Sequence, residues 1–220
     1  MAGGYVLFSA QGSGGVAVEA ALTLMGQTYQ LIDAPTFDPD QAAAGDQVLA
    51  ANPLRQVPAL VMPGGETLTE SAAILIWLAE QHPQARLAPA PGDPARGPFL
   101  RWMSFVSSAI YAHYWLKDDP MRLVSDPAQA DVIEARLNDR IAECWGIMEA
   151  GTAPGRYILG DELSVLDLYV TVVSRFRPRR QRFAAAAPRL GDVVRRVDQD
   201  PRLAAFWAER YPFETGWDRL

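Results

Sequence analysis

The sequence is poor in cysteine and carries an excess of negative charge. Among its 220 residues only Cys144 is a cysteine, which excludes an internal disulfide and leaves the redox compartment weakly constrained. The 20 Lys and Arg residues are outnumbered by 26 Asp and Glu residues, and the net charge is −6 at pH 7. This balance argues against binding to nucleic acid or to acidic membranes, so we expect neither among the partners.

Long apolar runs, targeting signals and metal motifs are also missing. A membrane-spanning helix needs about 18 apolar residues in a row, and no run in this chain approaches that length. The first 15 residues contain no basic residue and only a short apolar segment, unlike a secretory signal, so the cytoplasm is the expected location. No spacing of ligand residues predicts a metal site, and no phosphate-binding loop is present.

The first part of the chain alternates short strands with helices. Apolar runs bounded by turn residues predict strands at 5–8, 29–33, 57–62 and 66–68, and helices at 16–25, 41–50 and 72–82. The resulting β-α-β-α-β-β-α order indicates a small α/β domain with mixed strand directions over residues 1–82. The stretch from His82 to Pro98 then holds five prolines, Pro98 included, and predicts an extended linker at 83–97.

Only helices are predicted beyond the linker, in a second domain at 98–220. The apolar periodicity favours helices at 99–116, 128–150, 189–199 and 201–210, with Cys144 on the core face of the second. A further helix start is marked by Ser164 as N-cap and Asp167 at the third helical position, an Asp variant of the capping box.

A basic run stands out against the acidic composition. The stretch SRFRPRRQRF holds five arginines, at positions 175, 177, 179, 180 and 182. A solvated loop is the favoured interpretation, and an anion-binding rim or a partner surface is the alternative.

Pro58 interrupts an otherwise apolar strand. Proline cannot donate a ladder hydrogen bond, yet Pro58 stands at the start of the strand that leads into the Pro-Gly-Gly turn at 63–65. Taken alone, the Val-Pro dipeptide favours an ordinary trans proline at a sheet edge. The surrounding segments suggest a different interpretation.

Three segments in this order resemble the cytosolic glutathione S-transferase superfamily, of a bacterial, serine-type or atypical kind. They are NPLRQVPAL at 52–60, TLTES followed by AAILIWLAE at 67–80, and GDELSVLDLYV at 160–170. The resemblance implies the glutathione transferase fold, with a thioredoxin-like α/β N-terminal domain and an all-α C-terminal domain. It also implies glutathione as co-substrate and a homodimer that pairs the first domain of one subunit with the helical domain of the other.

The resemblance also suggests which residues bind glutathione. In such proteins the proline after the valine, here Pro58, is cis, and the main-chain N–H and C=O of Val57 pair with the cysteinyl part of glutathione. Gln56 is a further candidate for the same peptide. Glu70 suits the γ-glutamyl ammonium, and Ser71 at a helix start suits the carboxylate. The alternative is that Ser71 only caps its helix and Glu70 is solvated.

The remaining two ends of glutathione are its glycine carboxylate and its thiol. Arg55 is the nearest candidate cation for the carboxylate. Family members ionise the thiol with Tyr, Ser or Cys just after the first strand, but Gly14 falls at the cysteine position and Gly12 near the serine position. Ser13 is the best catalytic candidate, because its hydroxyl and the amides of Gly14 and Gly15 can face one sulfur atom. Alternatively, Ser13 is the N-cap of the first helix.

The electrophile pocket of the family lies between the domains, beside the first helix of the helical part. In SSAIYAHYWLKDD, the residues Tyr111, His113 and Tyr114 are the candidates to line it. They favour a small apolar or aromatic electrophile. Aromatic residues at helical spacing are otherwise part of a core.

Three functions follow from this pattern. The first is a glutathione transferase, in which the thiolate attacks an electrophilic carbon and forms a thioether. The second is a glutathione-binding interaction or ligand-carrier protein with little catalytic activity, for which Gly12 and Gly14 at the catalytic positions are the best argument. The third is a thiol-disulfide reductase, which the lack of an N-terminal cysteine disfavours.

Overall fold

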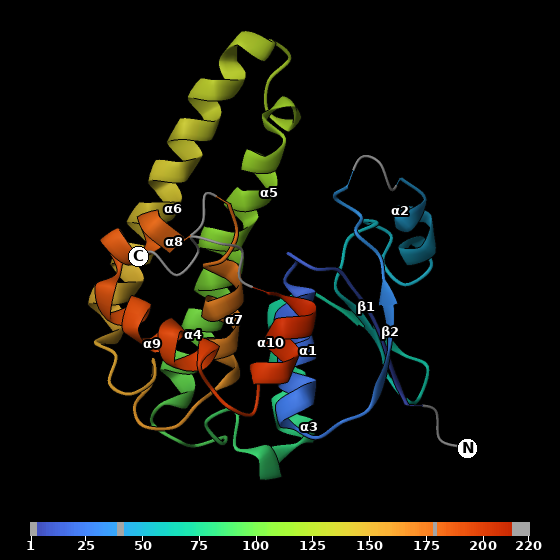
Figure 1. Cartoon of the computed structure of the whole chain (residues 1–220), viewed down its shortest axis with the longest axis vertical. Helices are drawn as coiled ribbons and strands as arrows, with labels where there is room; N and C mark the ends of the chain where they lie inside the picture. Colours follow the sequence, from blue (N-terminus) through green and yellow to red (C-terminus); the bar gives the residue numbers. More distant parts are fainter. Residues whose placement is uncertain (1–3, 39–41, 178–179, 213–220) are drawn as a thin grey trace.

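The chain folds into a sheet part followed by a helical part. The computed structural model describes residues 4–38, 42–177 and 180–212. The two parts lie side by side, with α1 (Gly15–Leu24) and α3 (Ser71–Gln81) between the sheet and the helices of the second part (Figure 1). The predicted fold class, an α/β first domain and an all-α second domain, is confirmed.

The sheet of the described residues has four strands in the spatial order β2-β1-β3-β4. They are β1 (Tyr5–Ser9), β2 (Tyr29–Asp33), β3 (Ala59–Val61) and β4 (Thr67–Thr69). β1 runs parallel to β2, whereas β3 is antiparallel to both β1 and β4. Leu7 and Leu60 pair across the centre of the sheet and are fully buried. The predicted mixture of strand directions is therefore correct.

Helices cover both faces of this sheet. They are α1 (Gly15–Leu24), α2 (Ala42–Leu49) and α3 (Ser71–Gln81). The small side chains of α1 let it pack closely against α3 and the helical part, and its first eight residues are buried. On the α2 side, Ala34, Ala44 and Val48 form a separate small core with Phe8 and Val57. Position 41, predicted as the start of this helix, lies outside the described residues.

The rest of the described chain is helical. Its longer elements are α4 (Arg96–Phe105), the π-helical segment η3 (Val106–Tyr111), α5 (Ala112–Asp118), α6 (Ala130–Thr152), α7 (Val165–Val173), α8 (Arg180–Ala186), α9 (Pro188–Asp198) and α10 (Ala204–Arg210). Single 3-10 turns are η2 (Pro83–Ala85), η4 (Pro120–Arg122) and η5 (Pro127–Gln129). The far ends of α5 and α6 project beyond the rest of the molecule (Figure 1). Positions 213–220 of the predicted second domain lie outside the described residues.

The helix predicted at 99–116 is not one regular α-helix. A π-helical segment at Val106–Tyr111 separates α4 from α5. A π turn takes up one residue more than an α turn, so it rotates the side chains that follow it. The apolar periodicity of the sequence does not reveal such an insertion.

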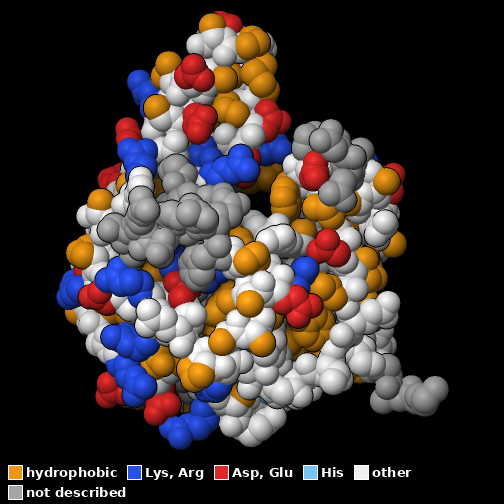
Figure 2. Space-filling model, viewed as in Figure 1, with side chains coloured by type: hydrophobic (Ala, Val, Ile, Leu, Met, Phe, Trp, Pro, Cys, Tyr) orange, Lys and Arg blue, Asp and Glu red, His pale blue; other side chains and the backbone are white. Residues whose placement is uncertain are grey.

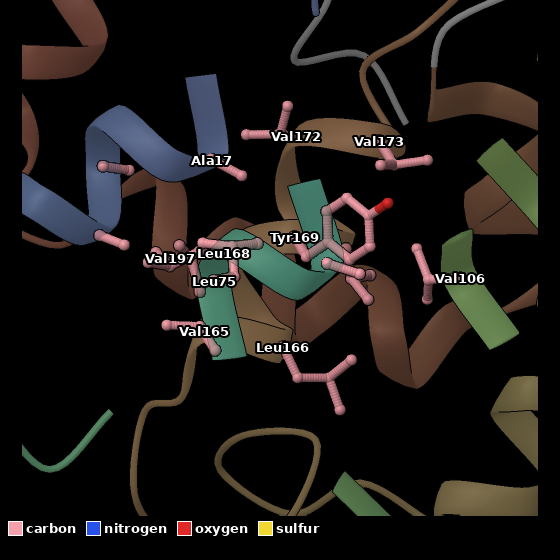
Figure 3. Close-up of a cluster of buried hydrophobic side chains, with 14 of the residues drawn as sticks. Ala17, Leu75, Val106, Val165, Leu166, Leu168, Tyr169, Val172, Val173 and Val197 are labelled. Atoms are coloured by element: carbon pink, nitrogen blue, oxygen red, sulfur yellow. The ribbon is translucent and has the colours of Figure 1, made fainter. Parts of the chain in front are cut away.

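α7 is the centre of the helical core. All nine of its residues are buried, and side chains from α1, α3 and η3 gather around it (Figure 3). The predicted capping box is present at its start, where the Asp167 carboxylate accepts hydrogen bonds from the amide of Ser164 at 2.8 Å and from its hydroxyl at 2.7 Å. The same carboxylate accepts the amide of Ile158 at 2.8 Å, so it also fixes the loop before α7.

The basic run at 175–182 is not a solvated loop throughout. That expectation is wrong for Arg175 and Arg180, whose side chains are buried. Both bind the carboxylate of Asp198, Arg175 at 2.5 Å, because α7 and α8 each pack against α9. Burial of these guanidinium groups is possible because each meets a charged partner. Position 179 lies outside the described residues.

Two further findings concern the described part of the chain alone. None of its helices combines the length and the apolar character that crossing a membrane requires. Its His, Cys, Asp and Glu side chains form no group of three or more suited to hold a metal ion.

Candidate functional site

The turn between β1 and α1 meets the helical part at Gly14. The main-chain amide of Gly14 donates a hydrogen bond of 2.8 Å to the phenol oxygen of Tyr111, at the end of η3. A Cβ atom placed on Gly14 would lie 2.6 Å from the Tyr111 ring and 3.1 Å from the hydroxyl oxygen of Ser71. The starts of α1 and α3 and the end of η3 therefore converge on one point, and only glycine fits at position 14.

Ser13 holds the shape of this turn. Its hydroxyl donates to the carbonyl of Ala10 at 2.7 Å, and it accepts the amide of Gly15 at 3.1 Å and that of Ala10 at 3.3 Å. The residue is only 3 % exposed. The N-cap of α1 is Gly14, so Ser13 is not the cap of this helix. Ser13 instead fixes the turn before the helix, and a main-chain carbonyl already engages its proton.

The next residue, Gly15, is confined by β1. A Cβ atom there would lie 2.2 Å from the hydroxyl oxygen of Ser9 and 2.8 Å from its Cβ. Real Cβ atoms do not approach other atoms so closely, so glycine is required for α1 to begin this near the strand.

The loop before Pro58 is organised by Asn52. The side-chain amide of Asn52 donates to the carbonyl of Gln56 at 2.8 Å, and its oxygen accepts the amide of Leu54 at 3.0 Å. Asn52 is buried, and its two bonds clamp both ends of a tight loop. Arg55 lies inside this loop with a φ of 56°. Asn52 thus sets the position of Gln56 and of the residue that follows it.

Val57 has unpaired main-chain groups. Its peptide bond to Pro58 is cis, and β3 begins only at Ala59. Within residues 4–38, 42–177 and 180–212, neither the N–H nor the C=O of Val57 makes a hydrogen bond. The Val57 side chain packs on the small α2 core, and both main-chain polar groups of Val57 remain available for hydrogen bonds of the kind that an added strand makes.

Glu70 has an unusual backbone conformation at the start of α3. Its φ of 66° and ψ of 108° are rare for a residue with a side chain, and such residues concentrate at functional sites. The Glu70 carboxylate is exposed and makes no hydrogen bond or ion pair with another described residue. The neighbouring Ser71 is 6 % exposed and donates its hydroxyl proton to the phenol oxygen of Tyr169 at 3.0 Å.

The guanidinium of Arg55 points to α2. It binds the carboxylate of Asp46 at 2.8 Å, with both side chains largely exposed. Arg55, the candidate for the glycine carboxylate, therefore already has an anionic partner. The ion pair is weak because both side chains are exposed to solvent.

Tyr111 is clamped between aromatic rings. Its ring centroid lies 5.1 Å from that of Phe176 and 6.3 Å from that of Tyr169. Burial raises the pKa of the Tyr111 phenol to about 12, against a smaller lowering by the amide of Gly14. The hydroxyl thus stays protonated at physiological pH.

The other two aromatic candidates differ from Tyr111. Tyr114 is 4 % exposed and packs edge-on against Phe176, so its ring is part of the core. The Nδ1 atom of His113 is buried without a hydrogen-bond partner among the described residues. The structure thus gives Tyr111 alone of the three a hydrogen bond to the β1–α1 turn.

Sequence reasoning missed two residues of this site. Asn52 belongs to the segment that carries the resemblance, but its clamp on Gln56 is visible only in the folded loop. Tyr169 lies in the capping segment and reaches Ser71 from 98 positions away. Asparagine before a proline is a turn signal and hints at the first, whereas nothing local signals the second.

Comparison with known proteins gives the same assignment for both parts of the chain. Residues 17–81 match the family model described as glutathione S-transferase, N-terminal domain, and residues 123–210 match the one described as glutathione S-transferase, C-terminal domain. The chain is 30% identical over 200 residues to an uncharacterized GST-like protein, YncG, of Escherichia coli strain K12, covering 90% of this chain and 94% of that one.

Solved structures agree with this. A glutathione transferase homologue from Sulfitobacter, solved with bound glutathione, superposes with a TM-score of 0.82 at 25% identity, covering 94% of this chain and 98% of that one. A sphingomonad glutathione S-transferase complexed with glutathione gives a TM-score of 0.75 at 28% identity, covering 91% and 96%. The predicted resemblance is confirmed, and this chain belongs to the glutathione S-transferase family.

Proposed function

We propose that this protein is a glutathione transferase that joins the glutathione thiolate to a small apolar or aromatic electrophile. The observation that carries the proposal is the unpaired main chain of Val57 close to the exposed carboxylate of Glu70. Val57 precedes β3 and Glu70 follows β4, and these strands pair with Ala59 opposite Thr69. The two binding elements therefore lie at the same end of these two neighbouring strands.

The cysteinyl unit and the γ-glutamyl end of glutathione each have a partner of matching chemistry in this arrangement. The N–H of Val57 donates to the cysteinyl main chain and its C=O accepts from it, so the cysteinyl unit adds as a short antiparallel strand with two hydrogen bonds and no side chain. The carboxylate of Glu70 meets the γ-glutamyl ammonium, and the first amides of α3 with Ser71 meet the γ-glutamyl carboxylate. Gln56, held by Asn52, lies beside the same strand.

The thiol of a peptide bound in this way lies toward the β1–α1 turn. That turn contains Ser13 and Gly14 and leads into Gly15, the first residue of α1. Within the turn, Ser13 is the residue whose side chain carries a hydroxyl. The electrophile enters from the helical side. In the space-filling view the surface is hollowed between the α5–α6 projection and the α2 side of the sheet part, and apolar side chains border the hollow (Figure 2).

A glutathione-binding carrier with little catalysis is the second candidate. The observation that favours it is that Gly12 and Gly14 bring no side chain to the sulfur, while the proton of Ser13 is engaged by the Ala10 carbonyl. This candidate shares the binding residues with the first and differs only at the thiol.

Binding and turnover are measured separately to test the proposal. Calorimetric titration with glutathione is expected to give one site per chain, and a glutathione-consumption assay against a panel of apolar and aromatic electrophiles is expected to give turnover. Binding without turnover on the whole panel supports the carrier. A protein that shows no glutathione binding and no turnover contradicts both candidates.

The proposal includes a homodimer, in which the sheet part of one subunit faces the helical part of the other. Large apolar side chains such as Phe37 and Leu100 are exposed on the single chain, and a partner subunit would cover such side chains. Sedimentation at micromolar concentration that gives only the 24.1 kDa monomer would contradict it.

A further inference from the structure

We propose that the phenol of Tyr111, supplied by the helical part, is the hydroxyl that holds the glutathione sulfur as a thiolate. The inference rests on the proposed function and names the group that activates its thiol. It starts from the contact between the Gly14 amide and the Tyr111 oxygen, which are 2.8 Å apart. This contact brings a phenol from 97 positions away to the start of α1.

The fit at Gly14 explains why the turn has no catalytic side chain. A cysteine or serine at position 14 would place its Cβ 2.6 Å from Cε1 of Tyr111 and 3.0 Å from its oxygen. The Tyr111 ring thus occupies the space into which such a side chain would extend. A phenol from the helical part therefore occupies the place that a reactive side chain at position 14 would take.

The available proton also distinguishes Tyr111 from its neighbours. The hydroxyl of Ser13 donates to Ala10, and that of Ser71 donates to Tyr169. Tyr111 accepts from Gly14, but within the described part of the chain its own proton has no acceptor. Among the hydroxyls at this point, Tyr111 therefore has the proton that a thiolate can accept without breaking a bond already made.

The phenol is positioned rigidly for this role. Tyr111 is the last residue of the π-helical segment η3, and such segments occur often at functional sites. Phe176 and Tyr169 restrain its ring from two sides. A rigid donor costs little reorganisation when the charge on sulfur develops.

The hydrogen-bond chain runs from the Gly14 amide through the Tyr111 hydroxyl to the sulfur. A donor to the phenol oxygen makes its O–H a stronger donor in turn. Burial keeps the phenol protonated, so it remains neutral and does not repel the thiolate. The thiol proton leaves to solvent and the sulfur pair forms the bond to the electrophilic carbon. The electron pair that this carbon gives up departs with a leaving group, or moves to a neighbouring atom that then takes a proton from water.

The test is Tyr111→Phe, which keeps the ring and removes the hydroxyl. Three quantities are measured: the glutathione dissociation constant, the pKa of the bound thiol from the ultraviolet absorbance of the thiolate, and kcat. Loss of a hydrogen bond to a charged group is expected to raise the thiol pKa by about one to two units. At neutral pH kcat should fall roughly 10- to 100-fold while the dissociation constant changes less than about twofold.

Tyr5→Phe is the matched control. It also removes one phenol hydroxyl from a hydrogen bond, here to His82 at 3.0 Å, at the other end of β1. All three quantities should stay as in the unsubstituted protein. Because a fluorinated tyrosine is a stronger donor, 3-fluorotyrosine at position 111 is expected to lower the thiol pKa, and it keeps the size and polarity of the site should Tyr111→Phe fold poorly.

The outcomes separate this inference from the proposed function. An unchanged thiol pKa in Tyr111→Phe, with glutathione still bound and turned over, overturns the role of Tyr111 and leaves the transferase intact. A thiol pKa that is insensitive to fluorination overturns it as well. An unsubstituted protein that does not bind glutathione overturns the proposed function, and this inference with it.

Discussion

The guanidinium of Arg210 lies 2.6 Å from the carboxylate of Glu19, which ties α10 to α1 across 191 positions of the chain. Glu19 is fully buried and also accepts the hydroxyl of Ser9 at 2.6 Å. The contact gives a buried carboxylate the charged partner that its burial requires. It also fixes the end of β1 and the helix whose first turn forms the candidate thiol site.

Removing the cation should therefore destabilise the protein. Arg210→Met leaves Glu19 buried without its charged partner, and we expect the free energy of unfolding to fall by about 3 kcal/mol. Urea unfolding measures this. Arg182→Met is the control, because Arg182 pairs with Asp139 where both side chains are largely exposed, and it should cost less than about 1 kcal/mol. Equal losses in the two variants would mean that the buried pair has no special weight.

Recognition of the γ-glutamyl end is tested by Glu70→Gln. The substitution removes the charge proposed to meet the ammonium and leaves the β1–α1 turn untouched. We expect glutathione to bind roughly tenfold more weakly, since the contact is charge-assisted but open to solvent. Glu66→Gln is the control, an equal loss of charge at the opposite end of β4. Calorimetry in which both variants bind as tightly as the unsubstituted protein would remove Glu70 from the site.

The start of α9 predicts a pH dependence of stability. Burial by itself would raise the pKa of Glu149, but hydrogen bonds from the Arg189 side chain and from the amides of Leu190 and Arg189 hold that pKa below its usual value of 4.5. A carboxyl with a lowered folded-state pKa stabilises the fold fully above the unfolded-state value. The stabilisation is lost as the pH falls through the folded-state value.

The corresponding measurement compares the unsubstituted protein with Glu149→Gln in urea at several pH values. The difference in free energy of unfolding should be constant near neutral pH and should shrink below about pH 4.5, as the carboxyl protonates in the native state. A difference that stays constant down to acid pH would show that the charge of Glu149 contributes nothing.

The parts of this molecule that the sequence predicts are those with local causes. The order of strands and helices follows from apolar periodicity, and the capping box of Ser164 and Asp167 requires residues only three positions apart. Short motifs also nominate Val57, Glu70 and Ser71 as candidates for glutathione binding. Each signal lies within one segment, so no knowledge of distant contacts is needed.

The parts that escaped prediction depend on distant partners. Nothing in the run at 175–182 indicates that Arg175 and Arg180 meet Asp198, because that carboxylate is 23 and 18 positions away and is brought near by the turn into α9. The link between Gly14 and Tyr111 depends on a π-helical insertion and on the packing of two domains. Local pattern therefore identified both residues without identifying their contact.

The last prediction concerns Ser13, the other candidate for thiol activation. Ser13→Ala removes a hydroxyl that donates to Ala10 and accepts the amide of Gly15, so the turn loses both of these hydrogen bonds. We expect the free energy of unfolding to fall by about 1 kcal/mol, the usual net contribution of an intramolecular hydrogen bond. The pKa of the bound glutathione thiol should not change, because the lost proton was already engaged by a carbonyl. Ser108→Ala, which removes an exposed hydroxyl bonded to the carbonyl of Ser104, is the control for both quantities. A rise in the thiol pKa as large as that expected for Tyr111→Phe would mean that Ser13 turns its proton to the sulfur when glutathione binds.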